Sequence, residues 1–153
     1  MIWEVKGDLL NLTVPHFFCH QVNHKGVMGS GIAFQIKNKY PMVFEDYRRN
    51  IFKKPLGENI ISRISDYKFC VNMIAQEGYG TDKQYTDYEA FESCLYALKV
   101  YLNILFPTKY FPWVVAFPYN IGCGRGGGDW NLIRSYIEKF SNEINLDVFI
   151  VRL

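Results

Sequence analysis

Two stretches of the sequence gather glycines where a strand-like run passes into a helix-like run. "VMGSGIA" (27–33) follows "FFCHQVNHKG", and "NIGCGRGGGDW" (120–130) follows "WVVAFPY". Glycine adds no side chain and costs conformational entropy, so such clusters are typical of left-handed backbone or of a main chain that closely approaches a ligand. The N–H groups at a helix start favour an anion. Two such junctions in 153 residues favour a clamp around a diphosphate or a phosphorylated sugar, with ordinary tight turns as the alternative.

Other phosphate-binding motifs are a poor match. "GCGRGG" formally fits G-x-G-x-x-G, but only about one strand follows it, so most of a dinucleotide-binding fold would be missing. The sequence has no G-K-[ST] and therefore no P-loop lysine for a triphosphate. The two loops must be interpreted on their own.

Three histidines, His16, His20 and His24, are spaced four apart, which would suggest a metal site on a helix. Pro15 and the run "FFCHQV" favour a strand instead, in which residues four apart are separated by roughly 13 Å. We therefore expect neither a metal nor another cofactor. His20 ends this strand just before the first glycine loop, where its ring is a candidate proton donor to whatever the loop binds.

Composition favours one globular domain over residues 1–153, with 49% hydrophobic residues to form its core. The net charge of +2 is spread along the chain, so nucleic acid is not an expected partner; "RRNIFKK" (48–54) is the main argument for one. Four scattered cysteines indicate reduced, mostly buried thiols. With no apolar leader and no run long enough to cross a membrane, we expect a cytoplasmic monomer with no membrane partner.

The elements expected around the loops alternate between strands and helices, which predicts an α/β sandwich with a largely parallel or mixed sheet. The expected strands are 1–5, 17–22, 59–64, 69–74, 113–117 and 147–151. The expected helices are 31–40, the stretch after Pro41, 86–106 and 129–144. Thr86-x-x-Glu89 is a candidate capping box for the third helix, and Asp129 and Trp130 are the expected N-cap and core anchor of the last. Ligands of such sheets lie at the carboxyl ends of the strands, where both glycine loops occur.

Three stretches, "VKGDLL", "CHQVNHKGVMGSGIAFQI" and "FPYNIGCGRGGGDW", occur in this order and are followed by an amphipathic helix and a last strand. In this respect the chain resembles the macro domain family of ADP-ribose-binding modules over nearly its whole length. The resemblance implies a single three-layer α/β/α domain with a mixed, largely parallel sheet of about six strands. It also implies that the second glycine loop wraps the diphosphate of ADP-ribose.

The resemblance assigns roles to individual residues. Asp8 would accept a hydrogen bond from the adenine amino group, Asn23 would contact the distal ribose, and Cys123 would act through its backbone N–H and not as a nucleophile. The implied ADP-ribose site comprises Gly7, Asp8, Leu9, Gln21, Val22, Asn23, Met28, Gly29, Ser30, Gly31, Ile32, Ala33, Asn120, Ile121, Gly122, Cys123, Gly124, Arg125 and Gly126.

Within the family, "HQVNHKGVMGSGIA" resembles the branch that includes ADP-ribose-1″-phosphate phosphatases, which have a histidine at the His20 position. The implied activity is metal-independent release of phosphate, with His20 as general acid or nucleophile and Asn23 orienting the ribose. The alternatives are a non-catalytic ADP-ribose module or sponge, a hydrolase that removes ADP-ribose from proteins, and a single-stranded nucleic-acid binder. The protein hydrolases use a lysine and an aspartate where this chain has Gln76 and Gly126, although Lys83 is close in sequence.

Overall fold

A single six-stranded sheet organises the chain, for which a computed structural model describes residues 1–109 and 111–153. The strand order is β1-β6-β5-β2-β4-β3, and every neighbouring pair is parallel except β3 and β4. The strands are β1 (Ile2–Lys6), β2 (Phe17–Asn23), β3 (Asn59–Ser65), β4 (Lys68–Gln76), β5 (Val114–Pro118) and β6 (Asp147–Arg152). The helices are α1 (Gly31–Lys39), α2 (Pro41–Asn50), the 3₁₀ turn η1 (Ile51–Lys53), α3 (Tyr88–Leu105) and α4 (Trp130–Asn142).

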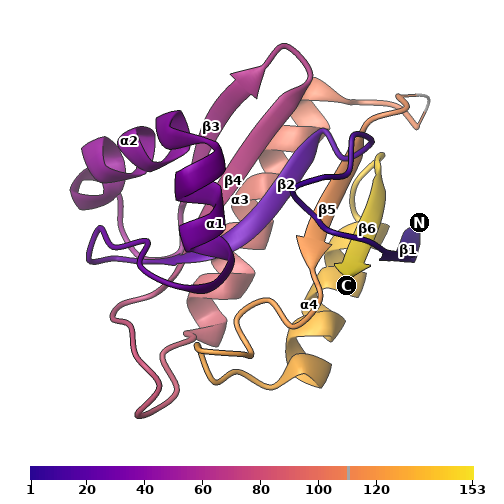
Figure 1. The fold of residues 1–153 in the computed structure, drawn as a ribbon. Helices are drawn as coiled ribbons and strands as arrows, with labels where there is room; N and C mark the ends of the chain where they lie inside the picture. Colours follow the sequence, from indigo (N-terminus) through magenta and orange to yellow (C-terminus); the bar gives the residue numbers. More distant parts are fainter. Residues whose placement is uncertain (110) are drawn as a thin grey trace.

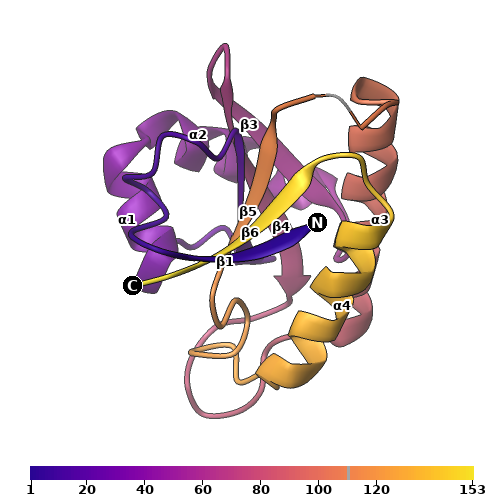
Figure 2. The same cartoon turned by 90° about the vertical axis from the view of Figure 1, so that its right-hand side faces the viewer.

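The helices cover both faces of the sheet and so confirm the predicted three-layer α/β/α fold (Figure 1). Figure 2 shows the layers edge-on, with α1 and α2 on one face and α3 and α4 on the other. Successive side chains of β2 point to opposite faces of the sheet, so this strand contributes to both hydrophobic layers. Phe17 and Cys19 belong to the core cluster on the α3 side, and Phe18 packs with Ile36 of α1 on the other side. Cys19, Cys70 and Cys94 are buried free thiols, as expected.

The start of α3 differs from the capping box expected at Thr86. Asp87 is the N-cap, and its Oδ1 accepts a hydrogen bond from the backbone N–H of Ala90 at 3.0 Å. Thr86 instead directs its hydroxyl at the second glycine loop. The N-cap of α4 is Asp129, as predicted, and Trp130 packs against the core cluster beneath α3 and α4.

Parallel pairing places the carboxyl ends of β2, β4 and β5 at the same end of the sheet. From that end one loop leads into α1, a second (77–87) leads into α3, and a third (119–129) leads into α4 (Figure 1). The register between β2 and β4 shifts between Val22 and Asn23, so the regular alternation of side chains ends at Asn23. Among the described residues, no helix is both long enough and apolar enough to cross a membrane.

Candidate functional site

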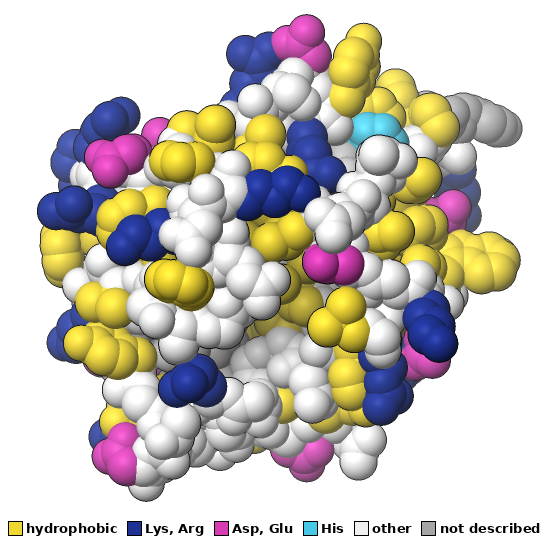
Figure 3. All heavy atoms as spheres, in the orientation of Figure 1, with side chains coloured by type: hydrophobic (Ala, Val, Ile, Leu, Met, Phe, Trp, Pro, Cys, Tyr) yellow, Lys and Arg dark blue, Asp and Glu magenta, His cyan; other side chains and the backbone are white. Residues whose placement is uncertain are grey.

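A cleft of about 540 Å³ opens where the two glycine loops meet at the carboxyl ends of β2 and β5. Figure 3 shows a hollow below the centre of this face, bordered mostly by backbone and by uncharged polar side chains. Among the residues that the structure describes, the cleft lining contains no aspartate, glutamate, histidine, lysine or cysteine, and Arg125 is its one charged residue. Such a surface suits an anion. Of the residues expected from the sequence, it brings together Gln21, Val22, Asn23, Gly29, Ser30, Gly31, Ile32, Ala33, Asn120, Ile121, Gly122, Gly124, Arg125 and Gly126.

The first glycine loop presents the start of α1 to the cleft. Ser30 is the N-cap in an extended conformation and makes no side-chain cap hydrogen bond. Gly31 has a φ of 61°, a left-handed conformation that side chains rarely adopt, and a Cβ there would meet open space. The first N–H groups of a helix have no intrahelical acceptor and carry the positive end of its dipole. The cleft therefore has one group of donors on this side.

The second glycine loop folds back on itself and leaves further donors exposed. Its internal hydrogen bonds include Cys123 N–H to Asn120 O at 2.8 Å and Gly128 N–H to Gly122 O at 2.9 Å. In the described part of the chain, the backbone N–H groups of Gly122, Gly124, Arg125 and Gly126 have no protein acceptor. Consecutive free amides of this kind form an anion-binding concavity.

Not every glycine of this loop is needed for the same reason. Gly122 and Gly127 have left-handed φ angles of 74° and 72°, and a Cβ on Gly126 would collide with Thr86 and with the Gly122 carbonyl. Gly124 lines the cleft, and a Cβ on it would have no neighbour within 4 Å. Gly122, Gly126 and Gly127 therefore allow the loop to adopt its shape, whereas Gly124 leaves space for a ligand in front of the loop.

Asn23 lines the cleft, and several hydrogen bonds fix its side chain. Its Oδ1 accepts hydrogen bonds from the backbone N–H groups of Lys25 and Val27 at 3.0 and 3.3 Å, and its Nδ2 donates to Val27 O at 2.7 Å. The Tyr47 hydroxyl lies 2.8 Å from the same Oδ1. One proton of the Asn23 amide remains available to a ligand.

The structure corrects the position expected for His20. Its side chain is wholly buried in the layer between the sheet and α1 and α2, on the same face of β2 as Phe18 and Val22. Val22, two residues nearer the end of the strand, lines the cleft, whereas His20 does not. Its Nε2 lies 2.5 Å from Asn72 Oδ1, and burial lowers the pKa of His20 to about 4, an effect that the Asn72 hydrogen bond partly opposes. A neutral, enclosed imidazole cannot donate a proton to a ligand in the cleft.

Five further expected residues lie outside the cleft lining. Leu9 and Met28 are buried in the core, so their side chains support the loops from below. Gly7 donates its N–H to Arg152 O, and Asp8 closes a turn by accepting from Leu10 N–H at 3.0 Å. Burial and the nearby Asp129 carboxylate raise the pKa of the Cys123 thiol to about 11, so this residue is not an activated nucleophile.

Six lining residues were not predicted from the sequence: Val27, Gln76, Tyr79, Gly80, Pro118 and Tyr119. Gln76 is the last residue of β4, and Tyr79 and Gly80 lie in the loop after it, so the only sequence signal for them was their position at or just after the end of the fourth strand. Tyr119 follows β5 directly, and the Arg152 guanidinium lies 4.1 Å from its ring centroid. These residues form the sides of the cleft.

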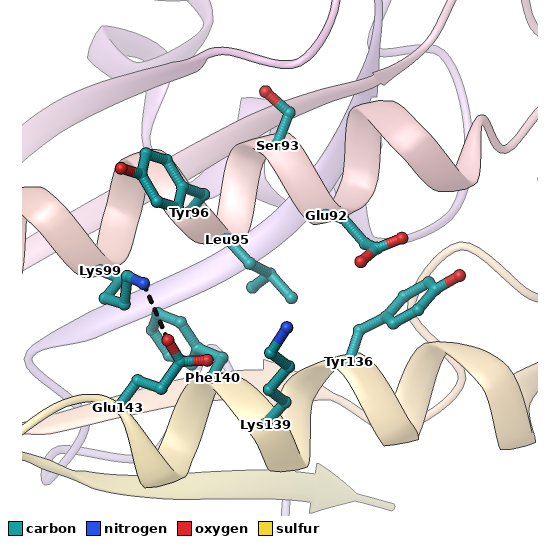
Figure 4. A pocket seen from close by; sticks show the side chains of 9 residues that line it. All are labelled: Glu92, Ser93, Leu95, Tyr96, Lys99, Tyr136, Lys139, Phe140 and Glu143. Atoms are coloured by element: carbon teal, nitrogen blue, oxygen red, sulfur yellow. Dashed lines mark hydrogen bonds and ion pairs between the residues drawn. The ribbon is translucent and has the colours of Figure 1, made fainter.

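A second cavity of about 310 Å³ lies between α3 and α4 and shares no lining residue with the cleft (Figure 4). Its lining includes the Lys99 ammonium, which is 2.8 Å from Glu143 Oε2, and Tyr136, whose ring packs against Phe91. Figure 4 shows the Lys139 side chain reaching into the space between the helices. Because acidic and basic groups occur side by side here, this groove has no preference for an anion.

The side chains of the basic stretch have mainly local partners, and His16 and His24 are hydrogen-bonded to backbone groups of distant segments. Arg49 forms an ion pair with Asp46, Lys54 is 4.0 Å from Glu58, and Arg48 lies over the Phe44 ring. The backbone N–H of Val114 donates to His16 Nδ1, and His24 Nε2 lies 2.8 Å from Lys54 O. Within the part of the chain that the structure describes, no three His, Cys, Asp or Glu side chains are grouped to hold a metal.

Comparison with protein sequences gives two relatives, and no family model matches the chain. An uncharacterized 17.5 kDa protein in the tk-vs intergenic region of Enterobacteria phage T4 is 23% identical over 156 residues, which cover 93% of this chain and 91% of the phage protein. An ADP-ribose 1″-phosphate phosphatase of Aspergillus clavatus is 36% identical over 77 residues. That match covers 50% of this chain and 35% of the phosphatase, so the similarity extends over about a third of that protein's length.

Solved structures match over almost the whole chain. A Bacteroides thetaiotaomicron protein covers 100% of both chains with a TM-score of 0.84 and 25% identity. The macrodomain of Thermus aquaticus DarG has a TM-score of 0.80 at 21% identity, covering 99% of this chain and 97% of that one. Thermosipho africanus DarTG in complex with ADP-ribose has a TM-score of 0.77 at 19% identity, covering 92% of this chain and 39% of that one.

Proposed function

The chain has the macrodomain fold, and on this premise we propose that its cleft binds ADP-ribose. The observation that carries the proposal is the convergence of two sets of backbone N–H donors, from the start of α1 and from residues 122–126, in one cleft without a carboxylate. A diphosphate carries its charge on oxygens that these donors can reach from both sides. The similarity to a structure solved with ADP-ribose supports this ligand.

The expected arrangement of the ligand follows the elements that surround the cleft. The diphosphate would lie between the start of α1 and the second glycine loop, and the distal ribose would lie near Asn23 and the Gln76–Gly80 wall. The adenine would lie toward Asp8, whose loop joins the end of β6 through the Gly7–Arg152 hydrogen bond. Backbone donors would supply most of the phosphate contacts, and the Arg125 side chain would add a positive charge at the rim.

Hydrolysis of ADP-ribose-1″-phosphate is a second candidate function, favoured by the 36% identity to the Aspergillus clavatus phosphatase over 77 residues. In this reaction water attacks phosphorus, the phosphorus–ribose oxygen bond breaks, and a proton passes to the ribose oxygen. The loop donors would neutralise charge on the phosphoryl group, and Asn23 would orient the ribose. Because His20 is buried and the cleft lining has no acidic side chain to supply that proton, the geometry supports binding more strongly than turnover.

Removal of ADP-ribose from proteins has less support. Gln76 and Gly126 line the cleft where the resembling hydrolases have a lysine and an aspartate, and neither supplies a charge. Lys83, the nearest lysine in sequence, has its Nζ 5.1 Å from the Tyr85 ring centroid and is not part of the cleft lining. Non-catalytic recognition of ADP-ribose remains the function that the site supports best.

Two assays on one protein preparation separate these functions. Calorimetric titration with ADP-ribose tests binding, and free phosphate released from ADP-ribose-1″-phosphate tests turnover. Gly124→Val serves as the control for contaminating phosphatases, because a side chain at this open position would fill the space in front of the loop. Binding without phosphate release supports the recognition module; phosphate release that Gly124→Val abolishes supports the phosphatase.

A further inference from the structure

We propose that Thr86 is a positioning residue that fixes the shape of the second glycine loop for the diphosphate. The inference rests on the proposed function, because it concerns how that same site is organised. Thr86 precedes α3 and is only 3% exposed, and it does not line the cleft. It therefore acts on a ligand through the loop and makes no contact of its own.

Hydrogen bonds from the segment before α3 fasten the loop at two points. The Thr86 hydroxyl donates to the Gly122 carbonyl at 2.5 Å. The backbone N–H groups of Tyr85 and Thr86 both donate to the Gly126 carbonyl, at 2.8 and 3.0 Å. These anchors enclose Cys123, Gly124 and Arg125, so they bracket the stretch that presents unpaired amides to the cleft.

The packing around Thr86 explains why the loop needs glycine at position 126. A Cβ on Gly126 would collide with the Thr86 hydroxyl and with the Gly122 carbonyl, and a Cβ on Gly128 would lie 2.8 Å from that carbonyl. The loop is thus wrapped tightly around the threonine side chain. A small displacement of Thr86 must be transmitted to the loop, because close-packed groups have no room to absorb it.

Neighbouring amides set the direction of the Thr86 proton. Gln21 Nε2 donates to Thr86 Oγ1 at 2.9 Å, which leaves the hydroxyl proton free to point at Gly122 O. The same Nε2 donates to Gln76 Oε1 at 2.7 Å, and Gln76 Nε2 donates to Gly78 O at 2.8 Å. This chain of hydrogen bonds runs from the second glycine loop through Thr86 and Gln21 of β2 to the Gln76–Gly80 side of the cleft.

Replacing the hydroxyl by a methyl group tests this arrangement with a side chain of almost the same shape. A carbon atom approaches a carbonyl oxygen only to about 3.3 Å. Thr86→Val would therefore push Gly122 away by a good part of an ångström and remove one of the two acceptors of Gln21 Nε2. Because anion binding depends on several donors aimed at one position, we expect ADP-ribose affinity to fall at least about tenfold.

The experiment is calorimetric titration of ADP-ribose into wild type, Thr86→Val, Thr86→Ser and Thr81→Val, with the melting temperature of each protein measured in parallel. Thr86→Ser keeps the donor, and Thr81 is an exposed threonine of the same loop that provides the matched control. We expect Thr86→Ser and Thr81→Val to bind within about threefold of wild type while Thr86→Val binds at least about tenfold more weakly. Thr86→Ala, which removes the hydroxyl without adding a clash, should also bind more weakly and replaces Thr86→Val if that variant does not fold.

The outcomes separate this inference from the function on which it rests. Wild-type affinity in folded Thr86→Val or Thr86→Ala, or a loss in Thr86→Ser as large as that in Thr86→Val, would overturn the positioning role while leaving ADP-ribose binding intact. Absence of binding by the wild type would contradict the proposed function itself. If Thr86→Ser binds ADP-ribose like wild type while Thr86→Val and Thr86→Ala do not, the hydroxyl is the group that matters. A general loss of stability would not depend on whether the side chain carries a hydroxyl.

Discussion

The Tyr47 hydroxyl lies 2.6 Å from the carbonyl oxygen of Asn23 and 2.8 Å from its Oδ1, and both side chains are buried. It also accepts a hydrogen bond from the backbone N–H of Gly26 at 3.1 Å. Helix α2 thereby holds the turn that leads from β2 to the first glycine loop. Burial raises the pKa of Tyr47 to about 12, so the hydroxyl stays protonated in this role.

Replacing Tyr47 by phenylalanine should lower the free energy of unfolding by about 1–3 kcal/mol, because Asn23 and Gly26 lose a buried partner. Asn23 should also become mobile, which we expect to weaken ADP-ribose binding. Urea denaturation and calorimetric titration measure the two effects. Phe44→Leu, a change in a partly buried ring beside Tyr47, controls for altered packing of α2. Equal affinity in Tyr47→Phe and wild type would show that this anchor does not serve the cleft.

The acid stability of the protein should depend on His20. The pKa of His20 is about 4 in the folded chain, against an ordinary value of 6.5, because burial disfavours the charged ring. The unfolded chain therefore binds the proton more readily. The resulting stabilisation is complete above pH 6.5 and is lost as the pH falls toward 4, by up to about 3 kcal/mol.

Urea denaturation at pH 7 and pH 4.5 tests this dependence. Between these values the wild type should lose about 2–3 kcal/mol more than His20→Gln, which keeps a polar side chain beside Asn72 but has no titrating ring. The same pH dependence in both proteins would assign the acid sensitivity to other groups.

The two glycines at positions 124 and 126 should respond differently to a side chain. Gly124→Val should fold with the wild-type melting temperature and lose ADP-ribose binding, because the new side chain fills the cleft and not the protein interior. Gly126→Ala should lose both, since its Cβ collides with Thr86 and the Gly122 carbonyl. Thermal melts and titrations of the pair check this; a Gly124→Val protein that binds normally would mean that this loop does not face the ligand.

Much of the fold was predictable from the sequence because short apolar runs bounded by glycine, proline, asparagine or aspartate alternate with helical periodicity. The six strands lie within one or two residues of their predicted positions. The helix-initiating aspartate at 129 was also predicted from local pattern, whereas the choice of Asp87 over Thr86 was not. That choice depends on a tertiary contact, because Thr86 is committed to Gly122 across the fold.

The candidate site was predictable at its loops and less so between them. Both glycine loops meet in one cleft, since parallel strands bring their carboxyl ends together. Position near the end of β2 suggested that His20 would reach the ligand, but the cleft begins at Gln21 and Val22, and His20 is enclosed in the α1/α2 layer. How far along a strand a cleft extends depends on tertiary packing, which the local pattern does not show. Tyr79 and Tyr119 belong to no recognisable sequence motif, and only the tertiary arrangement of their loops shows that they line the cleft.

Asp8 offers a test of the adenine end of the ligand. Asp8→Ala should weaken ADP-ribose binding by about 1.5–3 kcal/mol through loss of a charge-assisted hydrogen bond. Asp8 Oδ1 also accepts a hydrogen bond from Leu10 N–H, so Asp8→Ala disturbs the turn as well. Asp8→Asn is therefore the second variant to compare, because it keeps an acceptor for the turn but removes the charge. Comparable affinities in wild type and both folded variants would remove Asp8 from the adenine site.

We expect the cleft between the two glycine loops to bind ADP-ribose, and calorimetric titration of the wild-type protein with ADP-ribose is the decisive measurement. We predict saturable binding of one ADP-ribose per chain, which Gly124→Val abolishes in a protein that melts at the wild-type temperature. No detectable binding by wild type at millimolar ADP-ribose, or equal binding by Gly124→Val, would contradict it.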